Sequence, residues 1–235
     1  MSQLKAPDIA AIAGESLSPL EFTRLAAALP SLARQPKGSG DPVMVLPGFG
    51  ASDISTAPLR RYLTWLGYEV QGWGLGRNAG KVAEVLPDVV DQVRTMSRQH
   101  KSEVHLIGWS LGGVFARETA RENPNYVSQV VTMGSPVVGG PKYTTMGRLF
   151  EQRGANLDEI EATIAAREST PISVPMTSIY SKRDGIVGWR ASIDRHSPQV
   201  EHIEVYTTHL GLGISPDVFK IIAGKLADSS PKAVH

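Results

Sequence analysis

One serine on a glycine-rich turn constrains this chain of 235 residues most strongly. Residues 103–117 read EVHLIGWSLGGVFAR, so an apolar run enters the turn and a helical pattern follows it at once. A Cβ atom at Gly108 or Gly112 would collide with the neighbouring strand and helix, which is why glycine is needed there. The G-x-S-x-G pattern predicts a nucleophile elbow, a strained turn that holds the hydroxyl of Ser110 out above a sheet.

The same letters also occur in tight turns that glycines pack and in which the serine is incidental. The flanking sequence distinguishes the two cases, because an elbow requires a strand before the serine, a helix after it and catalytic partners further along the chain. The stretch around Ser110 has the first two features, and candidate partners follow it in the expected order.

Composition and charge narrow the class of protein. Hydrophobic residues make up 41% and charged residues 20%, which is typical of a globular protein with an ample core. The net charge of +1 comes without a basic block, so no nucleic-acid partner is expected. The chain has no cysteine, which excludes disulfides, thiolate metal sites and a cysteine nucleophile. Its histidines and carboxylates lack metal-ligand spacing, so no metal is expected.

The amino-terminal residues carry no sustained apolar run. We therefore expect no signal peptide and no integral membrane segment, and a cytoplasmic location. Residues 1–40 are expected to form a peripheral segment with one amphipathic helix over 19–33, and residues 41–235 to form the main domain.

Within the main domain, strand patterns and helix patterns alternate, which predicts a mostly parallel sheet with right-handed crossovers. The expected strands are 43–46, 68–73, the run before Ser110, 127–133, 176–180 and 202–206. The expected helices are 56–66, 81–100, 111–122 and 216–227. Residues 139–175 interrupt the alternation with two short helical patterns, which predict either a lid over the strand ends or an ordinary crossover made of two helices.

A serine hydroxyl needs a base to remove its proton and an acid to orient that base. Of six histidines, only His209 follows an expected strand at its carboxyl end, and a glycine-rich stretch comes next. Ligands bind at that edge of an open α/β sheet, so His209 is the predicted base. The alternative is a loop histidine without a catalytic role.

Asp184 is the best-placed acid, because it follows the expected strand 176–180 in a turn. Asp194 is the second candidate, and plain Asp-Gly turn chemistry is the alternative explanation of Asp184. The order Ser110, Asp184, His209 is the one associated with the elbow. A tetrahedral intermediate also needs two N–H donors, for which we expect the backbones of Leu111 and Phe49, with Gly50 as an alternative to Phe49.

Together these segments resemble the α/β-hydrolase family, and within it the small bacterial lipase-like esterases. The matching pieces are 46–50 (LPGFG), 108–113 (GWSLGG), 134–136 (GSP), the turn at Asp184, and His209, and the likeness spans about residues 42–228. The resemblance implies an eight-strand-type sheet, hydrolysis through an acyl-enzyme, and no cofactor. One departure is Pro47, where many lipases have histidine.

We therefore expect a serine hydrolase that cleaves carboxylic esters, with a small-molecule or lipid ester as substrate. The expected pocket walls are Trp109, Val137, Met146 and Phe150. The alternatives are an acyltransferase or thioesterase with the same three residues, and a non-catalytic binding module. Residues 74–79 (GLGRNA) match a dinucleotide-binding pattern, but the acidic residue expected at the end of the next strand is missing. A bend beside the active-site mouth explains them better.

Overall fold

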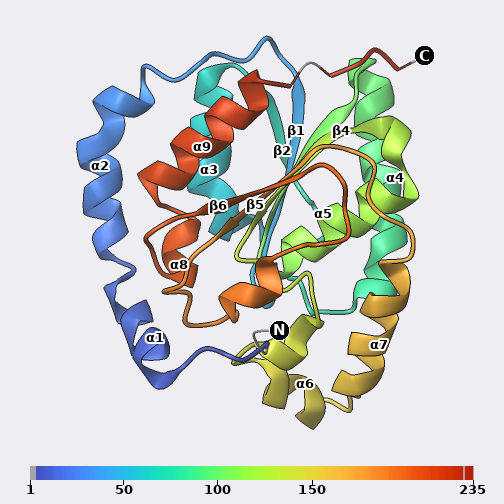
Figure 1. Cartoon of the computed structure of the whole chain (residues 1–235). Coiled ribbons are helices and arrows are strands. Elements are labelled where there is room, and N and C mark those ends of the chain that lie inside the picture. The colour runs from blue at the N-terminus through green and yellow to red at the C-terminus, as the bar shows by residue number, and fades with distance from the viewer. Residues whose placement is uncertain (1–3, 230, 235) are drawn as a thin grey trace.

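The computed structural model describes residues 4–229 and 231–234. Its centre is a sheet of six parallel strands in the order β2-β1-β3-β4-β5-β6 (Figure 1). The strands are β1 (Pro42–Leu46), β2 (Glu69–Gly72), β3 (Val104–Trp109), β4 (Val127–Met133), β5 (Met176–Tyr180) and β6 (Val200–Glu204). Because β1 pairs with β2 on one side and with β3 on the other, the strand order reverses at β1. Such a reversal opens a crevice at the carboxyl ends of the strands, where ligands bind.

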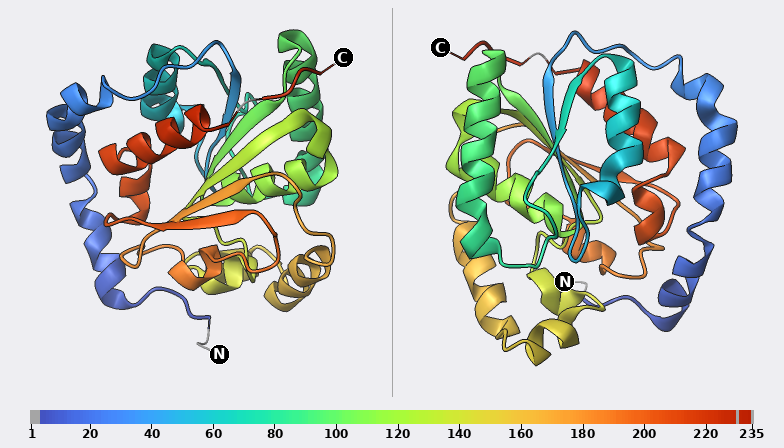
Figure 2. Two further views of the ribbon diagram at one scale, coloured as in Figure 1. Left: turned by 45° about the horizontal axis from the view of Figure 1, so that its top comes forward. Right: turned by 180° about the vertical axis from the view of Figure 1, so that it is seen from behind.

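Helices cover both faces of the sheet. The helices of the described residues are α1 (Ile9–Gly14), α2 (Leu20–Leu32), α3 (Asp53–Leu66), α4 (Val82–His100), α5 (Leu111–Glu122), α6 (Gly147–Gln152), α7 (Leu157–Arg167), α8 (His209–Leu212) and α9 (Pro216–Ala227). Two short 3-10 turns also matter below, η1 (Glu15–Leu17) and η3 (Gly140–Tyr143). The helices α3 and α9 lie against one face and α4 and α5 against the other (Figures 1 and 2).

The two faces of the sheet are built by alternate residues of the same strands. Val43 and Val45 of β1 point into the core under α3 and α9, whereas Met44 and Leu46 point into the core under α4 and α5. Successive side chains of a strand point to opposite faces, and both faces are covered by helices, so all four are buried. Strands covered on both faces read as continuous apolar runs, which is the pattern of residues 43–46.

The predicted α/β-hydrolase architecture is confirmed, but the implied eight-strand sheet is wrong, because six strands form within the described residues. The segment before β1 folds into α1, η1 and α2, so it adds no strand to either edge. β6 also begins two residues earlier than expected and ends at Glu204, because its pairing with β5 joins Met176 to Val200 and Tyr180 to Glu204.

The segment between β4 and β5, residues 139–175, holds η3, α6 and α7. Both views in Figure 2 place α6 and α7 at the end of the molecule where β1 and β3 finish. Ion pairs link α7 and the residue after it to α5: Arg167 lies 2.6 Å from Glu118, and Arg117 lies 3.1 Å from Glu168. α7 is therefore anchored to the main domain.

Candidate active site

Ser110 occupies the turn between β3 and α5 in a backbone conformation that favours glycine. Its φ is 54° and its ψ is −123°. Among the described residues other than glycine, only Ser110 and Lys101 have a positive φ. Such a conformation costs about 1–3 kcal/mol and persists where the surrounding structure enforces it, as is common at active sites. The backbone of Ser110 therefore has the strain that the sequence pattern predicts.

The glycines around Ser110 leave no room for side chains. A Cβ atom at Gly108 would overlap the backbone of Gly113, and one at Gly112 would overlap the carbonyl of Leu46. The end of β1, the end of β3 and the start of α5 therefore pack backbone against backbone. This close packing fixes where the turn presents its serine.

We expect Gly112→Ala to lower the free energy of unfolding by about 2–3 kcal/mol, because the added methyl group forces the Leu46 backbone to move. Gly224→Ala is the matched control, since Gly224 lies within α9 and an added Cβ there meets no atom within 4 Å. Helix propensity predicts a gain of about 1 kcal/mol for the control. Urea unfolding of both variants measures the two effects, and similar values for both would contradict this account of the turn.

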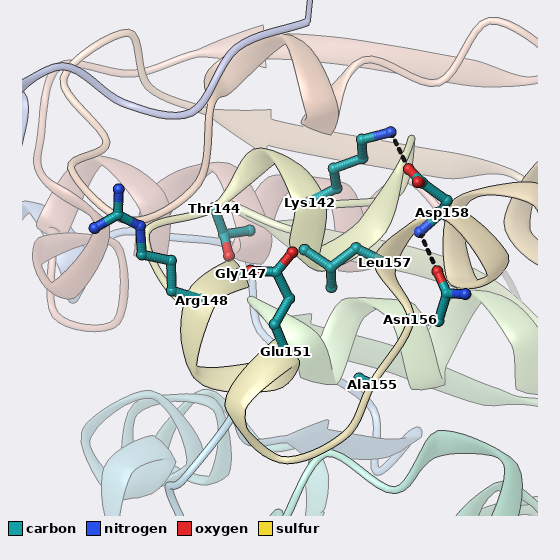
Figure 3. Close-up of a pocket in the computed structure, with 9 residues that line it drawn as sticks. All are labelled: Lys142, Thr144, Gly147, Arg148, Glu151, Ala155, Asn156, Leu157 and Asp158. Carbon is teal, nitrogen blue, oxygen red and sulfur yellow. Dashed lines mark hydrogen bonds and ion pairs between the residues drawn. The ribbon is translucent and has the colours of Figure 1, made fainter.

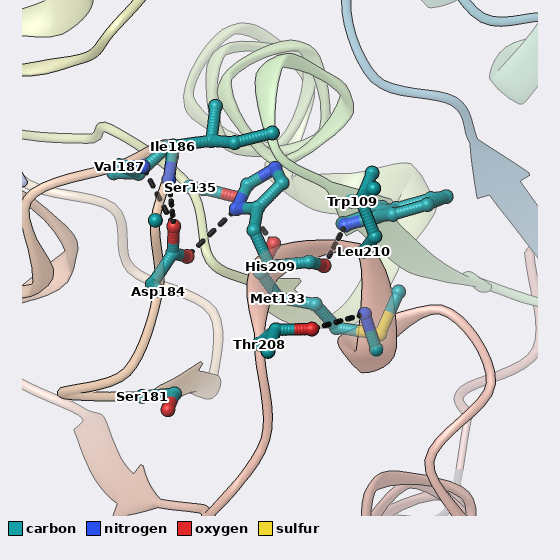
Figure 4. Close-up of polar contacts among 12 residues, drawn as sticks. Trp109, Met133, Ser135, Ser181, Asp184, Ile186, Val187, Thr208, His209 and Leu210 are labelled. Atoms are coloured by element: carbon teal, nitrogen blue, oxygen red, sulfur yellow. Dashed lines mark hydrogen bonds and ion pairs between the residues drawn. The ribbon is translucent and has the colours of Figure 1, made fainter. Parts of the chain in front are cut away.

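Asp184 and His209 form a buried hydrogen-bonded pair. The Nδ1 atom of His209 lies 2.7 Å from Oδ2 of Asp184, and less than 5% of either residue is exposed. The other oxygen, Oδ1, accepts from the backbone N–H groups of Ile186 at 2.9 Å and Val187 at 2.6 Å (Figure 4). In a neutral imidazole whose Nδ1 donates to a carboxylate, Nε2 carries no proton and can act as a base.

Several contacts bring the Ser110 turn to this pair. The indole Nε1 of Trp109 donates to the carbonyl of His209 at 3.2 Å, and the two rings lie 6.1 Å apart between centroids. The backbone N–H of Ser110 donates to Met133 at 2.8 Å. A Cβ atom on the next residue, Gly134, would lie 3.0 Å from His209 Nδ1. The turns after β3, β4 and β5 and the start of α8 therefore meet at one edge of the sheet.

The loop after β1 lies directly against Ser110. A Cβ atom at Gly48 would lie 3.1 Å from that of Ser110. The N–H of Gly50 donates to the carbonyl of Asn78 at 2.7 Å, so this alternative donor is already engaged. Asn78 is buried, and its side chain donates to the carbonyl of Pro47 at 2.9 Å. The glycine-rich stretch 74–79 therefore holds the loop that carries Phe49 in place through hydrogen bonds.

The four residues expected to form the pocket walls do not lie together. Met146 lines an open hollow of about 590 Å³ between the loop after β1 and α6. The ring of Phe150 packs on that of Phe49, with centroids 4.9 Å apart. Trp109 packs on His209 instead, while Val137 is buried in the turn after β4 and does not line the hollow.

Asp194, the second candidate for the acid, lies elsewhere. It is buried in an ion pair with Arg117 of α5, at 2.6 Å. Burial alone would raise the pKa of the Asp194 carboxyl, but the Arg117 guanidinium and the backbone N–H of His196 outweigh it and hold that pKa below its ordinary value. Asp194 therefore ties α5 to the loop before β6.

Glu15, which lies in η1, contacts the loops of Asp184 and His209 although no sequence pattern indicates it. Its Oε1 atom accepts from the backbone N–H groups of Gly185 at 2.8 Å and His209 at 2.7 Å, and its Oε2 atom accepts from that of Leu210 at 3.0 Å. No periodicity or motif marks this contact, because Glu15 and His209 are 194 residues apart. The amino-terminal segment thus reaches the loops that carry Asp184 and His209.

A second hollow, of about 530 Å³, lies within the segment between β4 and β5. Figure 3 shows Lys142 on one side of it with its amino group turned to Asp158. That amino group lies 2.6 Å from both Asp158 and Glu161, so its charge is already paired. The hollow is lined by residues 142–158 and is separate from Ser110.

Comparison with known proteins first defines the class. A lipolytic enzyme from the metagenome-derived pair LipS and LipT superimposes with a TM-score of 0.64 at 17% identity, over 83% of this chain and 95% of that one. An aryl esterase candidate from Burkholderia cenocepacia gives a TM-score of 0.58 at 15% identity, over 83% and 93%. The fold is that of the α/β hydrolases.

The family follows from the sequence. The profile of the palmitoyl protein thioesterase family matches residues 42–182, more than half of the chain, and the chain belongs to that family. The pimeloyl-[acyl-carrier protein] methyl ester esterase of Aeromonas hydrophila is 30% identical over 103 residues. That match spans 42% of this chain and 39% of the relative. Within the described residues, no helix has the length and apolar character needed to cross a bilayer.

Proposed function

We propose that this protein is a serine hydrolase that cleaves carboxylic esters through an acyl-enzyme on Ser110. The observation that carries the proposal is the buried Asp184–His209 hydrogen bond of 2.7 Å, at the sheet edge where Ser110 lies on its strained turn. A serine hydroxyl within reach of an imidazole that a carboxylate orients is nucleophilic near neutral pH, and this is the arrangement proposed for the half-buried Ser110.

In the first half of the proposed reaction, Oγ of Ser110 attacks the ester carbonyl and Nε2 of His209 takes its proton. Asp184 stays ionised and stabilises the imidazolium that forms. The carbonyl oxygen becomes an oxyanion, which the backbone N–H groups of Phe49 and Leu111 stabilise. Leu111 is the first residue of α5, so the helix dipole adds to this stabilisation.

The tetrahedral intermediate then collapses. His209 gives its proton to the leaving alcohol, which departs and leaves the acyl group on Oγ. In the second half, His209 takes a proton from water as the water attacks the acyl carbonyl, and it returns a proton to Oγ when the acid is released. These steps require no cofactor.

Membership of the palmitoyl protein thioesterase family favours thioester cleavage as a second candidate function. The same residues would serve, but a thiol is a stronger acid than an alcohol, so a thiolate leaves with less help from a protonated His209. The substrate is a small-molecule or lipid ester or thioester. The hollow beside Phe49 and Met146, of about 590 Å³, is large enough for a substantial acyl group.

A panel of p-nitrophenyl esters and matched acyl thioesters, from two to sixteen carbons, tests the proposal. We expect kcat for at least one series to exceed the rate constant of uncatalysed hydrolysis by several orders of magnitude. A higher value for esters supports the esterase, and a higher value for thioesters supports the second candidate. Pure enzyme that turns over neither series would contradict both. Addition of glycerol with analysis for acylated glycerol distinguishes acyl transfer from hydrolysis.

A further inference from the structure

One carboxylate outside the proposed triad holds both loops that carry its acid and its base. Oε1 of Glu15 accepts from the backbone N–H of Gly185, the residue after Asp184, and from the backbone N–H of His209 itself. Oε2 accepts from Leu210. The three distances lie between 2.7 and 3.0 Å. The two loops come from after β5 and after β6, and they are adjacent where Glu15 contacts them.

We infer that Glu15 is a positioning residue of the proposed hydrolase, and that its carboxylate sets the alignment of Asp184 with His209. The inference rests on the proposed function, since alignment matters only if these two residues act on Ser110. Glu15 touches neither the reacting atoms nor either functional side chain. It acts through the backbone on either side of the Asp184–His209 bond.

A carboxylate suits this position chemically. Two oxygens offer about four acceptor sites, and hydrogen bonds from N–H groups to an ionised acceptor are stronger than neutral ones. The helix α8 has only four residues, and its first N–H groups have no carbonyl within the helix to bond. Glu15 accepts from two of them, while the side chain of Thr208 accepts from Gly211 at 3.1 Å. The start of α8, and with it His209, is thereby fixed.

Neighbouring contacts hold the segment that carries Glu15 against the two loops. The hydroxyl of Ser18 lies 2.7 Å from that of Thr208, and the side chain of Thr207 donates to Glu21 at 2.9 Å. A Cβ atom at Gly185 would overlap the carbonyl of Ala11, so α1 and the Asp184 loop are in backbone contact. Asp8 accepts from Ala11 at 2.8 Å and caps α1 without reaching either loop.

The variants Glu15→Ala, Glu15→Gln and Asp8→Ala test the inference. Glu15→Ala should lower kcat by about 10- to 100-fold with KM within about threefold, because a displacement of about 1 Å at a catalytic group has an effect of that size. Glu15→Gln keeps one carbonyl oxygen that can accept from both Gly185 and His209, so it should recover most of the loss. Asp8→Ala removes a cap from the same segment and should leave kcat within twofold of the wild type.

A fluorophosphonate probe separates misalignment from unfolding. The probe forms a bond from its phosphorus to Oγ of Ser110 and expels fluoride, while His209 takes the serine proton. Glu15→Ala should label more slowly than the wild type but reach the same final stoichiometry. A final stoichiometry that falls in proportion to activity would show that the chain is merely unfolded, and would overturn the inference.

Three other results would also overturn it: kcat of Glu15→Ala within twofold of the wild type, Glu15→Gln as slow as Glu15→Ala, or Asp8→Ala as slow as Glu15→Ala. Failure of the proposed function gives a different result, since the wild type itself would then neither hydrolyse the ester panel nor be labelled at Ser110.

Discussion

Replacing Ser110 with alanine is expected to lower kcat/KM for the best ester or thioester substrate by at least about 10⁴-fold. The variant keeps Cβ and loses only Oγ, so no acyl-enzyme can form and His209 has no hydroxyl to deprotonate. The residual rate over water comes from the oxyanion donors and from substrate binding. Steady-state kinetics on the substrate panel, with active-site titration of the wild type, gives the ratio.

The fold should survive this change, because the tight packing at the turn involves Gly108 and Gly112 rather than the serine hydroxyl. The melting temperature of Ser110→Ala should therefore stay within a few degrees of the wild type. Ser31→Ala, which removes a hydroxyl bonded to the Ala28 carbonyl in α2, is the matched control and should keep full activity. Turnover by Ser110→Ala close to that of Ser31→Ala would refute the nucleophile assignment.

Asp184→Asn is expected to lower kcat by about 10⁴-fold, through the tautomer of His209. Oδ1 of Asp184 accepts two backbone N–H groups, from Ile186 and Val187, so the amide oxygen of asparagine must take that place. The amide NH₂ then faces Nδ1 of His209 and makes it an acceptor. The ring proton moves to Nε2, which can no longer take the proton of Ser110.

Asp194→Asn is the control for this variant, since Asp194 is also buried and paired. It leaves Arg117 without that partner and should lower the free energy of unfolding by about 3 kcal/mol. Because Asp194 contacts α5 rather than His209, kcat per folded molecule should stay close to the wild type. The assignment of the acid would be wrong if Asp194→Asn lost more activity than Asp184→Asn.

Most strands could be predicted because a strand that is buried on both faces is rich in apolar residues, and this is visible in the sequence. The run at 43–46 is continuous and apolar, and residues 127–133 are buried along their whole length although three of them are polar. Breakers follow both runs. β6 lacks that signal, because Glu201 and Glu204 are exposed on this edge strand. Its bounds come from pairing with β5, so the predicted range of 202–206 was shifted toward Tyr206. The residue patterns predicted six strands, which is the number observed, whereas the eight-strand sheet was implied by the family resemblance alone.

In the candidate site, Asp184 and His209 were predicted as acid and base because each follows the carboxyl end of an expected strand. The structure brings these two residues together. Asp194 stayed the second candidate in the sequence because it also follows β5, and the structure separates the two carboxylates by their partners, His209 for Asp184 and Arg117 for Asp194. The contact of Glu15 with the loops of Asp184 and His209 could not be predicted from the sequence for a different reason. A carboxylate that accepts backbone N–H groups requires nothing of the side chains at Gly185, His209 and Leu210, so no pattern of residue types records it.

The Glu15 contact can form only late in the synthesis of the chain, after its partners have been made. Glu15 leaves the ribosome before His209, which follows 194 residues later, or ~10–40 s at about 5–20 residues per second. The first partner of the carboxylate, the backbone N–H of Gly185, is synthesised 170 residues after Glu15, and the other two only with His209 and Leu210. A nascent chain halted before residue 209 would carry Ser110 on a complete β3 but would lack the proposed base, so under the proposed mechanism it could not yet hydrolyse a substrate.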